Sequence, residues 1–180
     1  MLRLLRFVNY VSAIALGTLA LAAGCSSSSP TAGDASPPAE AAQYFLTEAP
    51  VAAKSVVDAK KSAQDGEEVT LVGRIGGSES PFVSGRASFT IVDVSLVPCN
   101  EGPSDSCETP WDYCCSTDLP QATAVVKIVD ADGKAIAKDA KKDLGMKELQ
   151  TVTVKGKAKR DEAGNLVVSA PAVFVNSTPK

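Results

Sequence analysis

The chain has 180 residues, with 18 basic and 21 acidic side chains and no histidine, which gives a net charge of −3 at pH 7. A mildly acidic protein has no general attraction for nucleic acid. The absence of histidine removes the commonest general base and the Ser-His and Cys-His arrangements. We therefore expect a protein that is not an enzyme, needs no cofactor and has no nucleic-acid partner.

The N-terminus has the three-part pattern of a bacterial lipoprotein signal peptide. Two arginines precede an apolar stretch that ends in Gly24-Cys25. The stretch is shorter than the about 20 residues of a stable transmembrane span. We predict cleavage of residues 1–24 and lipidation of Cys25. The alternative is ordinary secretion with cleavage near Ala23.

An acyl chain on Cys25 would anchor the protein to a membrane surface without spanning it. The expected location is the cell envelope, on the periplasmic side of the outer membrane. Residues 25–45 are rich in Ser, Pro, Ala and Gly and predict a flexible tether. Cleavage removes two of the 18 basic residues and no acid, leaving 16 against 21, a net of −5. Residues 46–180 are enough for one domain with its own core.

Hydrophobic periodicity in this domain predicts one short helix followed by five strands. The helix covers residues 55–64 and the strands cover 69–75, 87–96, 123–129, 151–159 and 166–175. A helical piece is expected in the polar connection between the third and fourth strands. This order is that of a mainly β, five-stranded OB-like barrel. Glycines within two strands, Gly73 and Gly156, support a tightly coiled barrel. The alternative is a β-sandwich or a half-open sheet.

Three segments of the domain resemble the exported bacterial OB-fold (BOF) family: SVVDAKKSAQDGEEVTLVGRIGG, FTIVDVS and VTVKGKAKRDEAGNLVVSAPAVFV. The likeness spans about residues 55–175 and its motifs are short and non-catalytic. It implies an envelope binding domain rather than an enzyme. The chain departs from the family in its lipidation signal and in a cysteine-bearing insertion at 98–121. The PWDYCC segment of that insertion also looks like a signature of uncharacterised exported bacterial proteins.

After Cys25, every remaining cysteine lies in this insertion: Cys99, Cys107, Cys114 and Cys115. Outside the cytoplasm an even set of cysteines is usually oxidised. A bond between the adjacent Cys114 and Cys115 would be strained, so we expect each to pair with one of the other two.

Two alternatives use the same four thiols. Four cysteines could bind Zn²⁺ or Cu(I), although the C-x7-C-x6-C-C spacing differs from the paired C-x2-C of zinc ribbons. A thiol-redox role is the other alternative, although no C-x-x-C is present to lower a thiol pKa.

The same insertion supplies the predicted binding face, since long loops often carry function. It holds the sole tryptophan, Trp111, followed by Asp112 and Tyr113. Lys155 and Lys157 form part of a basic stripe on the fourth strand. A solvated strand face explains this stripe; an anionic glycan or a lipid head group is the functional alternative. The expected partners are therefore the membrane, through the lipid anchor, and an envelope protein or glycan.

Overall fold

The computed structural model describes residues 39–99, 101 and 107–177. The predicted signal peptide, the predicted lipidation site Cys25 and most of the predicted tether lie outside these residues. Within the described segments, no helix has the length and apolar character needed to cross a membrane.

The domain includes residues that the sequence assigned to the tether. The 3-10 helix η1 (Ala39–Tyr44) buries Ala41, which is 1% exposed. Phe45 forms a β-bridge with Val173 and packs against the core. Residues 41 and 45, which the sequence assigned to the tether, thus pack on the domain through small and aromatic side chains that find apolar partners.

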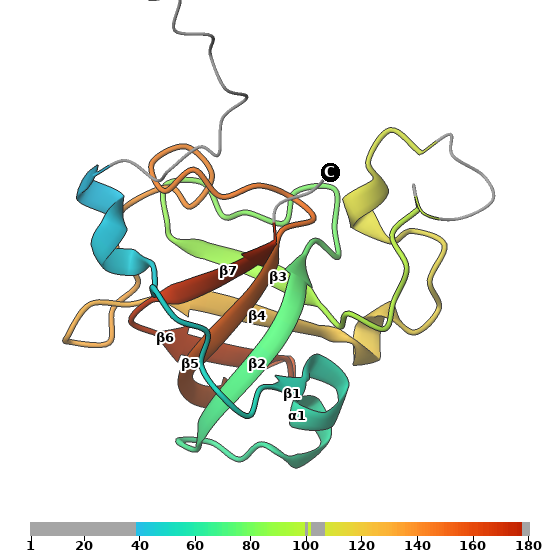
Figure 1. Ribbon diagram of the computed structural model, residues 1–180. Coiled ribbons are helices and arrows are strands. Elements are labelled where there is room, and N and C mark those ends of the chain that lie inside the picture. The colour runs from blue at the N-terminus through green and yellow to red at the C-terminus, as the bar shows by residue number, and fades with distance from the viewer. Residues whose placement is uncertain (1–38, 100, 102–106, 178–180) are drawn as a thin grey trace, which may run out of the picture. The chain divides into compact units, whose positions relative to one another are not determined.

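Five strands close into a barrel, and the mainly β fold predicted from the sequence is confirmed (Figure 1). The pairing order is β2, β3, β4, β6, β5 and back to β2. β4 and β6 are parallel, and the other four pairs are antiparallel. The bounds of the strands are β2 (Glu68–Ile75), β3 (Ser88–Val92), β4 (Thr123–Ile128), β5 (Thr151–Arg160) and β6 (Leu166–Ala170).

Two further strands extend the sheet. β1 (Lys54–Ser55) pairs in parallel with β2, and β7 (Val173–Ser177) pairs antiparallel with β5. The predicted last strand is divided into β6 and β7 by Pro171, which cannot donate to a ladder. The structure therefore has two strands where the sequence predicted one over 166–175.

The predicted short helix forms as α1 (Val56–Ser62), beside β1 and β2 (Figure 1). Ser55 is its N-cap and accepts a hydrogen bond from the backbone N–H of Asp58 at 3.0 Å. The carboxylate of Asp93, just after β3, accepts from the N–H of Val57 at 2.9 Å and from that of Ser95 at 3.0 Å. Asp93 thus ends β3 earlier than the sequence predicted and ties it to the start of the helix.

The core lies inside the barrel and follows the two-residue alternation of the strands. In β2, every second residue from Val69 to Ile75 is buried. The loop between β4 and β5 closes the core with Leu144 and Met146, each 1% exposed. The other fully buried large side chains of the core include Phe89, Ile91, Val126, Ile128 and Leu166.

Gly156 allows two strands of the barrel to approach closely. A Cβ atom at this position would lie 2.2 Å from the carbonyl oxygen of Ser169 and 2.9 Å from the Cα of Ala170, both backbone atoms of β6. At Gly73 the nearest atom to such a Cβ is the Cδ1 of Ile91, at 2.9 Å. The two glycines expected to coil the barrel are thus at positions with no room for a side chain.

The helical piece expected between the third and fourth barrel strands is not formed. Residues 129–150 contain turns and a short bridge but no helix. The Asp139 carboxylate accepts from the N–H groups of Gly85, Lys141 and Lys142. A side chain that binds nearby backbone groups in this way competes with a helix. Gly145, with a φ of 72°, also breaks the helical run.

Candidate functional site

The cysteine insertion lies to one side of the barrel and joins β3 to β4 (Figure 1). Its two ends meet where the N–H of Asp93 donates to the carbonyl of Ala122 at 2.8 Å. Two short 3-10 helices, η2 (Pro110–Asp112) and η3 (Leu119–Gln121), give its described part local structure. The insertion is therefore held at a defined position on the barrel.

Trp111 fastens the insertion to the loop that follows β2. Its indole Nε1–H donates to the carbonyl of Glu79 at 3.0 Å, and its own carbonyl accepts from the N–H of Gly77 at 2.7 Å. A Cβ on Gly76 would lie only 2.4 Å from that carbonyl oxygen. The indole N–H of the half-buried Trp111 is thus used in a hydrogen bond within the protein.

Tyr113, predicted to be part of the binding face, is 1% exposed. Its backbone adopts the left-handed conformation, with a φ of 56°, which turns the chain between Asp112 and Cys114. Burial raises the pKa of its phenol, which outweighs the opposing effect of the nearby Arg74. Its side chain is therefore part of the packing beneath the insertion and is not available at the surface.

Three thiols and one carboxylate converge at the turn. The Sγ of Cys114 lies 3.8 Å from the Sγ of Cys99 and 4.0 Å from that of Cys107. The Sγ atoms of these three residues and a carboxylate oxygen of Asp112 all lie within 4.8 Å of one another. We call these four residues the thiol cluster. The fourth thiol, that of Cys115, lies 3.8 Å from the Sγ of Cys114 and is outside this set.

Asp112 is fixed in place by the turn itself. Its Oδ1 accepts from the N–H of Cys114 at 2.9 Å and is 4.0 Å from the Sγ of Cys99. Its Oδ2 accepts from the hydroxyl of Thr109 at 2.9 Å. Desolvation opposes its ionisation, but these hydrogen bonds outweigh that effect and lower the pKa of the carboxyl. Asp112 is thus an anion beside the thiols.

The thiols of the cluster differ in acidity. The pKa of Cys114 is raised, first by the hydrogen bond of its thiol to the Asp112 carboxylate and then by contacts with Cys115 and Cys99. The pKa of Cys99 is lowered: desolvation opposes its ionisation, but hydrogen bonds from the Cys115 N–H and from neighbouring thiols outweigh it. The cluster therefore brings together groups that an incoming cation would deprotonate.

The disulfides expected from the sequence are not formed in this structure. All four cysteines are free, and the sulfur separations of 3.8–4.0 Å compare with about 2.05 Å for a disulfide bond. Three of the sulfurs instead cluster with the Asp112 carboxylate, and the fourth, that of Cys115, lies beside that of Cys114. This arrangement brings together all four insertion cysteines and Asp112, as the sequence placed them in one loop.

The other predicted binding residues, Lys155 and Lys157, lie on β5, away in sequence from the insertion. Lys155 forms an ion pair with Glu68, with its Nζ 2.9 Å from Oε1. The β5–β6 register places Lys157 opposite Ser169. Lys155 is therefore paired with an acidic side chain, whereas Lys157 lies opposite a serine on the neighbouring strand.

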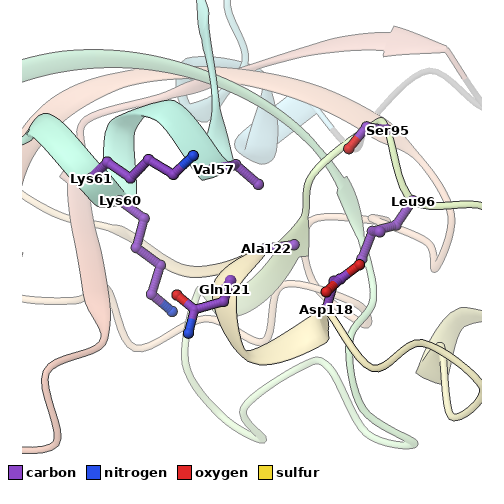
Figure 2. A pocket seen from close by; sticks show the side chains of 8 residues that line it. All are labelled: Val57, Lys60, Lys61, Ser95, Leu96, Asp118, Gln121 and Ala122. Carbon is purple, nitrogen blue, oxygen red and sulfur yellow. The ribbon is translucent and has the colours of Figure 1, made fainter.

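A pocket, which the sequence did not reveal, lies at the base of the insertion and has a volume of about 510 Å³. Figure 2 shows the side chains that line it. The Nζ of Lys60 donates to the carbonyls of Pro120 at 2.6 Å and of Thr123 at 3.3 Å, so α1 is tied to the end of the insertion. Burial, and then the charge of Arg160, lower the pKa of Lys60. The lining residues are Val57, Lys60, Lys61, Ser95, Leu96, Asp118, Gln121 and Ala122.

No protein-family model and no curated protein matches the chain. The resemblance to the exported OB-fold family consequently stays a prediction from short sequence motifs.

Proposed function

We propose that the chain is a lipid-anchored envelope protein, without catalytic activity, whose thiol cluster binds a thiophilic metal ion, with Zn²⁺ as the best fit. The observation that carries this proposal is the convergence of Cys99, Cys107, Cys114 and Asp112 within 4.8 Å. An OB-like barrel is the proposed scaffold, because the strand order β2-β3-β4-β6-β5 and the parallel β4–β6 pair are those of that fold.

The sulfur separations favour a metal site over disulfides. Tetrahedral Zn²⁺ with Zn–S bonds of about 2.3 Å holds its sulfurs about 3.8 Å apart. The Sγ atoms of Cys99 and Cys114 are 3.8 Å apart, and those of Cys107 and Cys114 are 4.0 Å apart. These two sulfur pairs are therefore already at the spacing that Zn²⁺ requires, and the remaining distances of the cluster are within 4.8 Å, whereas a disulfide requires an approach of almost 2 Å.

The fourth ligand favours Zn²⁺ over Cu(I). Zn²⁺ accepts carboxylate oxygen beside thiolates, whereas Cu(I) selects sulfur. Asp112 is held toward the cluster by Thr109 and the N–H of Cys114, which is the support that metal-bound carboxylates usually have. An all-sulfur site would instead take Cys115 as its fourth ligand.

The envelope location is supported by the sequence alone, through the apolar segment that ends at Cys25. Intact mass of the protein purified from a bacterial membrane fraction tests it. We expect loss of residues 1–24 and a mass increment for acyl chains on Cys25. Recovery of an uncut, unacylated chain from the soluble fraction would refute lipid anchoring.

Metal content tests the function. The full chain, purified without chelator, should retain about one equivalent of Zn²⁺, measured by native mass spectrometry and elemental analysis. Co²⁺ should give the visible bands of a tetrahedral thiolate site. Cys114→Ser should abolish retention, while the matched control Cys115→Ser should keep it. Asp112→Asn should weaken Zn²⁺ binding by about tenfold or more.

Alkylation separates this proposal from the disulfide prediction. We expect four alkylated thiols after the metal is removed by a chelator without reductant. A protein with no alkylatable thiol and no retained metal would show that the cysteines are crosslinked and would overturn the proposal. If Cys115→Ser lost Zn²⁺ while Asp112→Asn retained it fully, the fourth ligand would be the Cys115 sulfur and not the Asp112 carboxylate.

A further inference from the structure

The outer face of the barrel carries a groove of unpaired positive charge on a protein whose net charge is −3. Two hollows, of about 860 Å³ and about 510 Å³, share Lys127 and Ser169 and so adjoin on the β4–β6 face. Arg86 and Lys134 line the larger hollow, and Lys159 and Arg160 line the smaller. We call this continuous surface the basic groove.

The strand register gives the groove a polar floor. Ser88 of β3 lies opposite Lys127 of β4, Lys127 lies beside Ser169 of β6, and Ser169 lies opposite Lys157 of β5. These four residues form one row across four strands. Neighbouring strands are about 4.8 Å apart, so the two lysines of the row are separated by about 10 Å of sheet. The row thus continues beyond the groove to Lys157, which lines neither hollow.

The cations of the groove form no ion pair in the described residues, although the charge of Lys127, after hydrogen bonds within the turn, helps to lower the pKa of Asp161. The Arg160 guanidinium already donates to the carbonyls of Lys60 and Gly164. Among the described residues, no ion pair within 4.0 Å involves Arg86, Lys127, Lys134, Lys159 or Arg160, whereas Lys155 on the same strand is paired with Glu68. Two acids, Asp161 and Glu162, line the end of the smaller hollow. The Asp161 carboxylate is already engaged by the N–H groups of its own turn.

We propose that the basic groove binds an anionic polysaccharide, a flexible chain that carries repeated carboxylate or sulfate groups. Five cations against two acids leave an excess of three positive charges, which complements such a chain. The partly exposed Ser169 hydroxyl adds a donor for sugar oxygens, whereas Ser88, at 4% exposed, lies in the buried floor. This proposal does not depend on the thiol cluster.

The surroundings of the groove disfavour other polyanions. None of the residues lining the two hollows, all in the described part of the chain, is aromatic. Single-stranded nucleic acid needs aromatic side chains on which its bases stack. A protein partner needs buried aromatic or aliphatic anchors. A lipid bilayer offers a plane of charge, whereas these cations line concave surfaces.

Binding of the full chain to alginate and to a sulfated polysaccharide, measured by calorimetry at low salt, tests the proposal. We expect an affinity that falls steeply as salt is raised, because exposed charges are screened. Lys127→Gln/Lys134→Gln should raise the Kd by about tenfold, given the usual strength of exposed charge pairs. The control Lys61→Gln/Lys155→Gln removes the same charge outside the groove and should change the Kd by less than about twofold.

Three results would overturn the proposal. The first is that both double variants weaken polysaccharide binding equally. The second is that the protein binds anionic lipid vesicles or single-stranded DNA more tightly than either polysaccharide. The third is that it binds neither polysaccharide at low salt. Thermal unfolding of each variant, followed by circular dichroism, confirms that the fold is retained. Measurements on metal-loaded and chelator-treated protein should give the same Kd, so failure here is distinguishable from failure of the thiol cluster to bind metal.

Discussion

Replacement of Gly156 by alanine tests whether the barrel depends on the close approach of β5 and β6. The new methyl would lie 2.2 Å from a backbone oxygen of Ser169. Non-bonded atoms of this size make favourable contact at about 3.5 Å, so the strands must separate by about 1 Å. Overpacking of this kind costs about 1–3 kcal/mol, and each weakened ladder hydrogen bond adds about 1 kcal/mol.

Against this, alanine lowers the entropy of the unfolded chain and recovers about 0.4–1 kcal/mol. We therefore expect Gly156→Ala to reduce the free energy of unfolding by about 2–3 kcal/mol. Urea denaturation followed by circular dichroism measures it, with an unchanged m-value showing that both states keep their compactness.

The matched control is Gly73→Ala, where the new methyl would lie 2.9 Å from the Cδ1 of Ile91 and 3.0 Å from the backbone oxygen of Val92. These overlaps are smaller than the 2.2 Å approach at Gly156, so the loss should be smaller, about 1 kcal/mol. A loss below about 1 kcal/mol for Gly156→Ala, or an equal loss for both variants, would refute the reasoning from backbone contact.

Three further predictions follow from buried polar groups. Burial opposes ionisation of Asp93, but hydrogen bonds from the Val57 and Ser95 N–H groups lower its pKa. Its stabilising effect is thus complete above the unfolded pKa of about 3.9 and is lost as the pH falls through the lower folded value. Asp93→Asn should flatten the acid side of the stability–pH profile from urea titrations; an unchanged acid slope would contradict this. Tyr113→Phe should leave stability unchanged or raise it by up to about 1 kcal/mol, because the buried hydroxyl, although near Arg74, makes no hydrogen bond of good geometry in the described residues; a loss above about 1 kcal/mol in thermal unfolding would show that the contact with Arg74 is a stabilising hydrogen bond. Trp111→Phe should cost about 1 kcal/mol through loss of the Nε1–H bond to Glu79; chemical denaturation that shows no loss would contradict an anchoring role.

The strands and the helix were predictable from the sequence because their periodicity is local. Alternation in residues 69–75 and 151–159 matches the buried positions of β2 and β5. The connection at 135–149 was predicted wrongly, since its structure depends on a distant contact, the hydrogen bond from the N–H of Gly85 to Asp139. The end of β3 was missed for the same reason, because Asp93 caps a helix 36 residues earlier.

The candidate site was predictable in composition but not in geometry. The cysteines could be placed in one loop, but their spacing does not show that Asp112 turns back toward them. The left-handed backbone of Tyr113 produces that turn, and tyrosine is not a residue that signals it. The burial of Tyr113 follows from the same turn. The basic groove was not predicted as a site, because its cations come from separate strands and loops. The predicted Lys157 adjoins it in the strand register but lines neither hollow.

The insertion leaves and re-enters the barrel at adjacent points, where Val92 of β3 pairs with Thr123 of β4. Because the two strand ends are already paired, the length of the chain between them can change with only a small change in loop-closure entropy. Because Asp93 lies on the barrel side of the insertion, its bonds that tie β3 to α1 do not pass through the insertion, so the length of the insertion can vary without breaking them.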